Sequence, residues 1–178
     1  MSDDVMNKKD GLLKHSLMTD SHTPTQRHAN MAAIRGKNTK PEIIVRKWLW
    51  REGFRYRVND KKLPGKPDIV LPKYRVAIFI NGCFWHGHEG CRYYTVPKSN
   101  TEFWTSKVAR NKERDLKNTT LLREQGWAVW TIWECQLKNN TLLETLLSLS
   151  YQLSHRLLQI HSKAYGGMEP EIVIAAEE

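Results

Sequence analysis

The chain has 178 residues, with 28 Lys and Arg against 19 Asp and Glu, so its formal net charge is +9 at pH 7. No apolar run approaches the ~20 residues of a membrane-spanning helix, and an odd number of cysteines, three, argues against a disulfide framework. The positive charge favours a polyanionic partner, most often nucleic acid, although a solvated basic surface would show the same surplus. The N-terminus lacks a signal-peptide pattern, so we expect a cytoplasmic protein in a reducing compartment.

Residues 1–25 are polar and carry no apolar period, so they are predicted to form a flexible arm, followed by a short helix at 27–35. The next helix should begin after Thr39, because a hydroxyl N-cap is followed there by Pro and an acid in the first turn. Its apolar residues repeat at helical spacing as far as Gly53, where a helix is expected to end.

The remaining elements alternate between period-two and helical patterns, which predicts an α/β domain at 26–165 with a mixed central sheet flanked by helices. Phe54, Tyr56 and Val58 alternate with polar residues, as in a strand with one buried face. The C-terminal tail is placed at 166–178. The predicted strands span 54–59, 68–71, 75–80 and 127–133, and the predicted later helices span 101–125 and 142–158.

Two cysteines and two histidines lie within nine residues, from Cys83 to Cys91, and thiolate and imidazole are the ligands that Zn²⁺ prefers. A site made of Cys83, His88, Cys91 and the distant Cys135 would use every cysteine and leave His86 for other work. We favour it over a local site in which His86 replaces Cys135, because histidines separated by one residue are poorly placed to share one tetrahedral ion in so tight a loop. Buried free cysteines without a metal remain a third interpretation.

Two acids are candidates for a role in chemistry, Asp68 as a metal ligand and Glu42 as a catalytic residue. Asp68 opens a predicted strand beside the central strand at 75–80, where a carboxylate, main-chain oxygen and water can hold Mg²⁺, although Pro-Asp is also a common turn. Glu42 lies in the first turn of a helix, where an acid is by default favoured by the helix dipole.

Three aromatic residues also attract attention. Phe84 and Trp85 lie between candidate zinc ligands, and Trp104 precedes a helix rich in Lys and Arg. Aromatic residues are usually core, but a stiffened loop can also insert apolar wedges between bases.

These residues together resemble the Vsr family, the bacterial very-short-patch-repair mismatch endonucleases. The most specific signal is Gly-Cys-Phe-Trp-His after a buried strand, with Trp-Glu-Cys farther on. The matching strings run in order from about residue 27 to residue 137, and they include Leu-Pro-Gly-Lys-Pro-Asp at 63–68, Phe-Ile-Asn-Gly-Cys-Phe-Trp-His at 79–86, Thr-Glu-Phe-Trp at 101–104 and Trp-Glu-Cys at 133–135.

The resemblance implies a restriction-endonuclease-like fold with a structural zinc site. It implies Mg²⁺-dependent nicking of the mispaired-thymine strand, 5′ of the thymine, in T·G mismatches that arise when 5-methylcytosine deaminates, and thereby the start of very-short-patch repair. The implied partners are mismatched duplex DNA, repair factors and an associated cytosine methyltransferase. The protein is expected to be a nucleoid-associated monomer with no membrane partner.

The resemblance also implies roles for individual residues. The catalytic residues would be Asp68, His86, Glu42 and Asn81. Magnesium would be held by Asp68 and the main-chain carbonyl of Ile80, and zinc by Cys83, His88, Cys91 and Cys135. The DNA-intercalating residues would be Phe84, Trp85 and Trp104, and the phosphate contacts would be Lys107, Arg110, Asn111 and Arg114.

The chain departs from the family pattern in two places. Family members commonly read Phe-Thr-His-Gly-Cys where this chain has Ile80 and Asn81 in the second and third positions. The main-chain carbonyl of Ile80 could hold the metal unchanged. Asn81 cannot titrate, so His86 alone would act as the general base. The loop at 87–90 is one residue longer than the family's His-rich run and has two glycines, which suggests a looser loop and a shifted sequence preference.

Two other classes of function fit the sequence. A sequence-specific endonuclease of the same fold would not need the wedge of Phe84 and Trp85. A non-catalytic, zinc-stabilised DNA-binding module would not need Asp68 and His86.

Overall fold

The computed structural model describes residues 23, 25–26, 29, 32 and 36–164. Contacts divide the chain into two units, residues 1–36 and 37–178, and every element below belongs to the second. The arm and short helix predicted before residue 36 lie largely outside the described residues, and the predicted tail at 166–178 lies wholly outside them. No helix in the described part is long and apolar enough to cross a membrane.

Helix α2 spans Lys40–Arg51 and begins where the sequence predicts. The Thr39 hydroxyl accepts from the Glu42 amide, and the Glu42 carboxylate accepts from the Thr39 amide, which completes a capping box. After the helix, Gly53 has φ +84°, the left-handed conformation that glycine adopts without strain and that commonly ends a helix.

Four strands form one mixed sheet in the order β1-β2-β3-β4. Strands β1, β2 and β3 pair antiparallel, whereas β3 and β4 are parallel, with Ile80 opposite Ile132. A parallel pair needs a long crossover, and the loop and helix between β3 and β4 provide it. The strands span Arg57–Val58 (β1), Ile69–Leu71 (β2), Val76–Asn81 (β3) and Ala128–Trp133 (β4).

The first predicted strand is wrong in length and in burial. Only Arg57–Val58 pairs, and Val58 is 47% exposed, whereas Phe54 is buried in the segment before the strand. The alternating pattern predicted one buried face along the whole segment. The pairing is shorter because β2 has only three residues, so little of the edge strand finds a partner.

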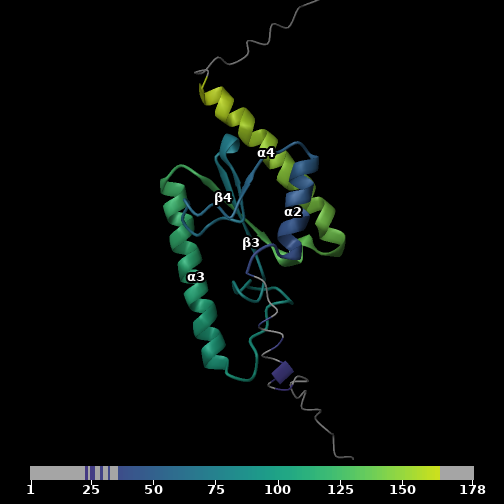
Figure 1. The fold of residues 1–178 in the computed structure, drawn as a ribbon, viewed down its shortest axis with the longest axis vertical. Coiled ribbons are helices and arrows are strands. Elements are labelled where there is room, and N and C mark those ends of the chain that lie inside the picture. The colour runs from purple at the N-terminus through teal and green to yellow at the C-terminus, as the bar shows by residue number, and fades with distance from the viewer. Residues whose placement is uncertain (1–22, 24, 27–28, 30–31, 33–35, 165–178) are drawn as a thin grey trace, which may run out of the picture. The chain divides into compact units, whose positions relative to one another are not determined.

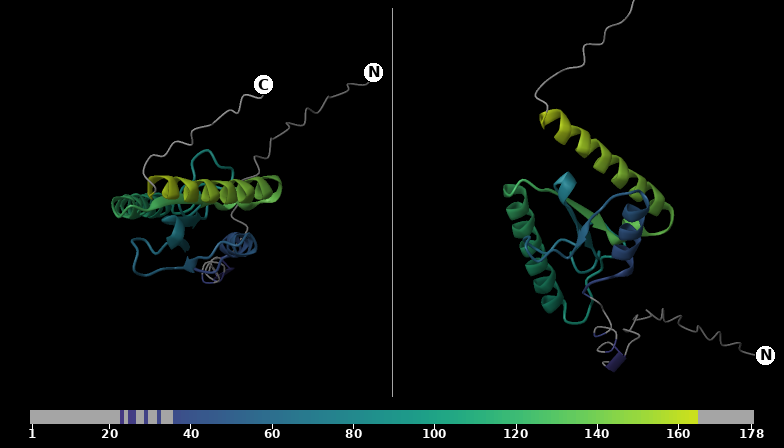
Figure 2. Two further views of the ribbon diagram at one scale, coloured as in Figure 1. Left: turned by 90° about the horizontal axis from the view of Figure 1, so that it is seen from above. Right: turned by 45° about the horizontal axis from the view of Figure 1, so that its top comes forward.

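Helices cover both faces of the sheet. Figures 1 and 2 show α3 (Thr101–Glu124) along one side, with α2 and α4 (Leu142–Ala164) on the other. Three short 3₁₀ helices lie at Pro72–Tyr74, Glu134–Leu137 and Asn139–Thr141. The prediction of an α/β domain with a mixed sheet flanked by helices is therefore confirmed.

The main core lies between the sheet and the layer of α2 and α4. Alternate residues of β3, Val76 and Ile78, are fully buried there, as expected for side chains that point to one face of a strand. Helix α4 contributes leucines at helical spacing and continues six residues past its predicted end at 158. The apolar side chains buried in this core are Val45, Leu49, Phe54, Ile69, Leu71, Val76, Ile78, Ile132, Leu137, Leu146, Leu149 and Leu153.

Candidate functional site

Asp68 and the end of β3 meet through a side-chain hydrogen bond. The Ile80 amide donates to Asp68 Oδ2 over 2.7 Å, and Asp68 stands immediately before β2. One carboxylate oxygen is therefore held by the neighbouring strand, which fixes the carboxyl group at the end of the sheet. The other oxygen, Oδ1, has no protein hydrogen-bond partner among the described residues.

The carbonyl of Ile80 points to the same side of the strand as its amide, because both groups of one residue share a direction in a β-strand. Extending the register in which Ile69 lies opposite Ile78 places Pro67 opposite Ile80. Proline has no N–H, so the ladder can supply no donor to the Ile80 carbonyl at this position. The Ile80 carbonyl and Asp68 Oδ1 are oxygen ligands of the kind that Mg²⁺ uses, and the pair fits such an ion.

The environment of Asp68 disfavours its charge. Burial raises the pKa of Asp68 to about 6 from 3.8, against the opposing effect of the Ile80 amide, while the nearby carboxylate of Glu42 raises it further. Arg46 and His86 are close enough to lower the pKa. A cation bound beside Asp68 would favour the ionised form and so oppose the effect of burial on its pKa.

Glu42 is buried, and its carboxylate is already hydrogen-bonded within the protein. It accepts from the Asn38 amide over 3.0 Å, from the Thr39 hydroxyl over 2.9 Å and from Arg46 Nη2 over 2.7 Å. Arg46 also donates to Asn38 Oδ1 and, over 3.2 Å, to the Asp68 main-chain carbonyl. Arg46 therefore links the start of α2 to the segment that carries Asp68.

His86 pairs with Asp115 of α3. Its Nδ1 contacts Asp115 Oδ2 directly, and 23% of the His86 side chain is exposed. A carboxylate at Nδ1 fixes the ring orientation and leaves Nε2 as the nitrogen that can take a proton from outside. The His86–Asp115 pair therefore has the geometry in which a carboxylate can orient an imidazole for general-base work.

Asn111, one turn before Asp115 on α3, holds the loop that carries His86. It is only 9% exposed, and its Nδ2 donates to the Trp85 main-chain carbonyl over 2.8 Å. The Asn111 amide is thus engaged within the protein, and the phosphate contact predicted for Asn111 stays a prediction. The turn itself needs Gly87, which has φ +60° and where a Cβ would lie 2.6 Å from both Val108 and Lys112 side chains.

The four cysteine and histidine residues of the favoured set come together. Their ligand atoms all lie within 4.8 Å of one another, and Cys135 Sγ lies 3.4 Å from His88 Nδ1. Tetrahedral Zn²⁺ with bonds of ~2.0–2.3 Å places its ligand atoms about 3.5–3.8 Å apart, so this cluster fits that ion. His86 is not part of the cluster.

The protein environment alone does not favour a full set of thiolates. Burial raises the pKa of Cys83 to about 12, and burial also raises the pKa of Cys135, whereas hydrogen bonding by the Tyr93 amide lowers that of Cys91. A divalent cation would supply the charge that keeps these thiols ionised. The ring of His88 stacks on Trp133 at 4.1 Å between centroids and 1° between planes, which fixes its orientation.

The three predicted wedge residues form one aromatic cluster. Phe84 lies 5.2 Å from Trp85 and 5.3 Å from Trp104, centroid to centroid, and the two tryptophans are 6.0 Å apart, all in edge-to-face arrangements. None of the three is fully buried. They lie beside the loop that carries His86, so the aromatic surface and the candidate base adjoin.

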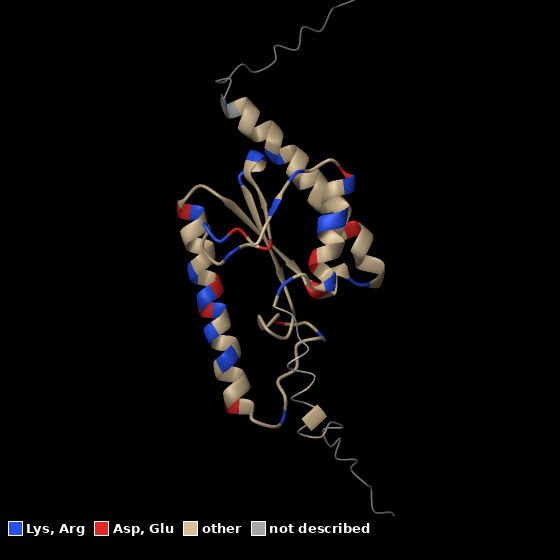
Figure 3. Cartoon of the chain, in the orientation of Figure 1, with Lys and Arg blue, Asp and Glu red and all other residues tan. Residues whose placement is uncertain are grey.

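The predicted phosphate contacts Lys107, Arg110 and Arg114 are exposed on α3. Figure 3 shows this helix marked along its length by Lys and Arg. Exposed cations of this kind are available to phosphates, whereas Asn111 lies on the buried side of the helix.

Two residues of this site were missed by the sequence analysis, Arg46 and Asp115. Each is a single charged residue on a helix otherwise rich in charge, and nothing local distinguishes it from a solvated one. The one available signal was spacing, since Arg46 follows Glu42 by four residues and Asp115 follows Asn111 by four.

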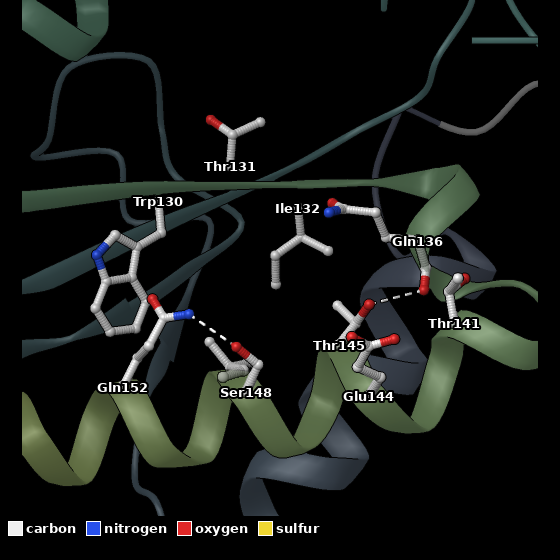
Figure 4. Close-up of a pocket in the computed structure, with 10 residues that line it drawn as sticks. Trp130, Thr131, Ile132, Gln136, Thr141, Glu144, Thr145, Ser148 and Gln152 are labelled. Carbon is white, nitrogen blue, oxygen red and sulfur yellow. Dashed lines mark hydrogen bonds between the residues drawn. The ribbon is translucent and has the colours of Figure 1, made fainter.

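A separate polar groove of about 320 Å³ lies between β4 and α4 (Figure 4). Its walls are held by Gln152, which donates to Ser148 over 3.0 Å, and by Thr145, which donates to the Gln136 carbonyl over 3.0 Å. None of the predicted site residues lines this groove. The candidate site is therefore elsewhere, around the end of β3 and its loop.

Comparison with known proteins shows the family to which the chain belongs. The family of DNA mismatch endonuclease Vsr matches residues 19–92. The type II nicking enzyme V.NmeAIP of Neisseria meningitidis serogroup A is 51% identical over 131 residues, which cover 74% of this chain and 93% of that protein. The type II nicking enzyme V.XorIIP of Xanthomonas oryzae pv. oryzae is 44% identical over 130 residues, which cover 73% of this chain and 95% of that protein. DNA mismatch endonuclease Vsr of Escherichia coli K12 is 43% identical over 121 residues, with coverage of 68% and 77%. The resemblance predicted from the motifs is confirmed, and the chain belongs to the Vsr family of DNA mismatch endonucleases.

Proposed function

We propose that the protein nicks DNA at T·G mismatches and cuts the mispaired-thymine strand on the 5′ side of the thymine. The observation that carries this proposal is that Asp68, held by the Ile80 amide, lies near enough to His86 to interact with its charge, while His86 pairs with Asp115. A candidate metal site and a candidate general base thus adjoin an aromatic surface. Deamination of 5-methylcytosine would produce the substrate, which places the enzyme beside a cytosine methyltransferase and factors that complete the repair.

Asp68 and the Ile80 carbonyl would hold Mg²⁺ at the scissile phosphate. When bound there, the ion would supply polarisation of phosphoryl oxygens and stabilisation of the charge on the leaving 3′-oxygen. His86 Nε2 accepts a proton from the attacking water, while Asp115 orients the ring through Nδ1 and stabilises its charged form. Asn81, at the end of β3, is placed to hydrogen-bond a phosphate or a water but carries no proton to exchange.

Glu42 has a positioning role in this scheme. Its oxygens are taken by the capping box and by Arg46, so it acts on the site through its charge and through the Arg46 link to Asp68. The resemblance implies that Glu42 is a catalytic residue, and in this proposal it is a positioning residue instead.

Zinc is proposed to bind Cys83, His88, Cys91 and Cys135. Four protein ligands leave no open position for a reacting water, so the ion would be structural. It would tie the loop with Phe84, Trp85 and His86 to the start of the 3₁₀ helix that carries Cys135. The restriction-endonuclease-like fold stays part of this proposal, with one chain cutting one strand as a monomer.

The wedge formed by Phe84, Trp85 and Trp104 would give the enzyme its preference for mispairs. Unstacking a base step costs a few kcal/mol, and a mismatched step requires less than a paired one. The test is a panel of end-labelled duplexes that are identical except for one central base pair. Preferred Mg²⁺-dependent nicking of T·G over the other mispairs supports the proposal, and equal nicking of a fully paired duplex contradicts it.

A further inference from the structure

Phe103 is a large apolar residue that no part of the proposed site uses. It is 54% exposed, more than the three wedge aromatics beside it. Its ring packs edge-on against Trp104, with centroids 5.1 Å apart and planes at 78°. A single exposed apolar residue is common on protein surfaces, so exposure alone indicates nothing.

The residues that share the Phe103 side of α3 indicate what its exposed ring could contact. Going along the helix, the side chains at i+4, i+7, i+11 and i+14 from Phe103 share its side, and each of them is an exposed cation. We call this set the α3 stripe; its residues are Phe103, Lys107, Arg110, Arg114 and Lys117. The buried side of α3 is different and includes Val108, Asn111 and Leu122.

The spacing of the cations in the α3 stripe suits contacts to the phosphates of one strand of a DNA duplex. At 1.5 Å of rise per residue, Lys107 and Lys117 are about 15 Å apart along the helix. One strand of duplex DNA advances about 3.4 Å per nucleotide along the duplex axis, so the four cations of the stripe span roughly four nucleotides in that direction. A strand whose phosphates follow these cations arrives at Phe103 and Trp104 at the N-terminal end of the helix.

We propose that Phe103 is a further DNA-contacting residue, whose ring stacks on a base of the strand that the α3 stripe follows. It would extend the aromatic wedge by one ring beyond Trp104 and help to set the preference for a mispaired step. The proposal rests on the proposed function, since it assumes that the wedge faces DNA. A stacked base is worth on the order of a tenfold change in affinity.

The test compares three variants. Phe103→Leu keeps an apolar side chain but removes the ring, and Phe103→Ala removes both. Leu116→Ala is the matched control, because Leu116 is 67% exposed on the same helix but lies about 140° around the axis from Phe103. Zinc content and thermal melting show whether each variant is folded, and if Phe103→Ala fails to fold, Phe103→Leu carries the test.

Two measurements are made without Mg²⁺, so that the DNA stays intact. The first is the affinity for T·G and T·A duplexes. The second is photo-cross-linking of the wild-type protein to T·G duplexes with 5-iododeoxyuridine at single positions near the mismatch, followed by mass spectrometry of the linked peptide. Cross-linking reports direct contact with the ring, which a merely supporting role behind Trp104 would not give.

We expect both Phe103 variants to lose about tenfold in affinity for the T·G duplex and to show a reduced preference for T·G over T·A. The affinities of Leu116→Ala should be those of the wild-type protein, and the wild-type protein should cross-link through Phe103. Wild-type affinity retained in Phe103→Leu, or cross-links to Trp104 without any to Phe103, would overturn the inference. The proposed function fails separately, if the wild-type protein itself shows no preference for T·G over T·A.

Discussion

Asp68 Oδ2 accepts a hydrogen bond from the Ile80 amide over 2.7 Å. Pro67, which lies opposite Ile80 in the extended register, has no N–H to donate to the Ile80 carbonyl. In the described part of the chain Asp68 Oδ1 has no hydrogen-bond partner, and the Ile80 carbonyl at the same end of the sheet has no donor from the β2 ladder. Burial raises the pKa of Asp68 to about 6, so the site holds a carboxyl group that is costly to ionise without a cation.

Asp68→Asn should remove nicking activity but stabilise the protein in the absence of Mg²⁺. The pKa of Asp68 lies above its unfolded value of 3.8, so the folded state binds the proton more tightly. Stability from this group is present below about pH 4 and is lost as the pH rises through about 6. The advantage of Asp68→Asn should therefore grow over that range to about 1–3 kcal/mol.

The measurement is chemical unfolding of both proteins from pH 4 to pH 8 without added Mg²⁺. A stability difference that does not change with pH would show that Asp68 is not the buried acid described here. Unimpaired nicking by Asp68→Asn would remove Asp68 from the metal site.

His86→Ala should lower the nicking rate by at least ~10²-fold, as expected for a positioned general base. Asp115→Asn should also slow the reaction, by at least ~10-fold, because it no longer orients the ring or stabilises its charged form. The double variant should be no slower than His86→Ala, since two residues that act as one unit are not additive. Single-turnover rates at saturating enzyme measure these effects, and additive losses would mean that the two residues act separately.

Cys135→Ala should lose the zinc and much of the stability, because a structural ion contributes folding free energy directly. The wild-type protein should carry about one Zn²⁺ per chain by elemental analysis. His86→Ala is the matched control and should keep its zinc, since His86 lies outside the cluster of four ligands. Zinc lost from His86→Ala and retained in Cys135→Ala would support the local ligand set instead.

Trp85→Ala should reduce the preference for T·G over T·A duplex, beyond any uniform loss of affinity. The wedge gains most where a step unstacks easily, so its removal affects the mismatch most. Trp50→Ala is the control, because Trp50 is a tryptophan with 60% exposure at the far end of α2, outside the aromatic cluster. Binding and nicking of both duplexes provide the ratio, and an unchanged ratio in folded, zinc-loaded Trp85→Ala would assign the cluster to the core.

The sequence predicted the inner strands well. Strands β2, β3 and β4 begin or end within one residue of their predicted positions, because each is an apolar run bounded by Pro, Gly or polar residues. The edge was less predictable. Val58 alternates as a buried residue would, yet alternation cannot show that the strand beside it is only three residues long.

The site was predictable where its residues are close in sequence. The loop from Cys83 to Cys91 carries three of the four residues of the cysteine and histidine cluster, and Cys135 followed as the remaining cysteine. Hydrogen-bond partners that lie far apart in the sequence were not predictable. Asp115 lies 29 residues from His86, and Arg46 lies 22 residues from Asp68, so only the packing of α3 and α2 against the sheet brings each pair together.

The central claim, strand-specific nicking at a T·G mismatch, is tested most directly with two duplexes that differ only in the base opposite one thymine. Each strand carries a different end label, and single-turnover nicking is followed with Mg²⁺ for the wild-type protein and for Asp68→Asn. We predict one cut, immediately 5′ of the mispaired thymine, in the T·G duplex with the wild-type protein alone. Cutting of the guanine strand, equal cutting of the T·A duplex or activity in Asp68→Asn would contradict the account.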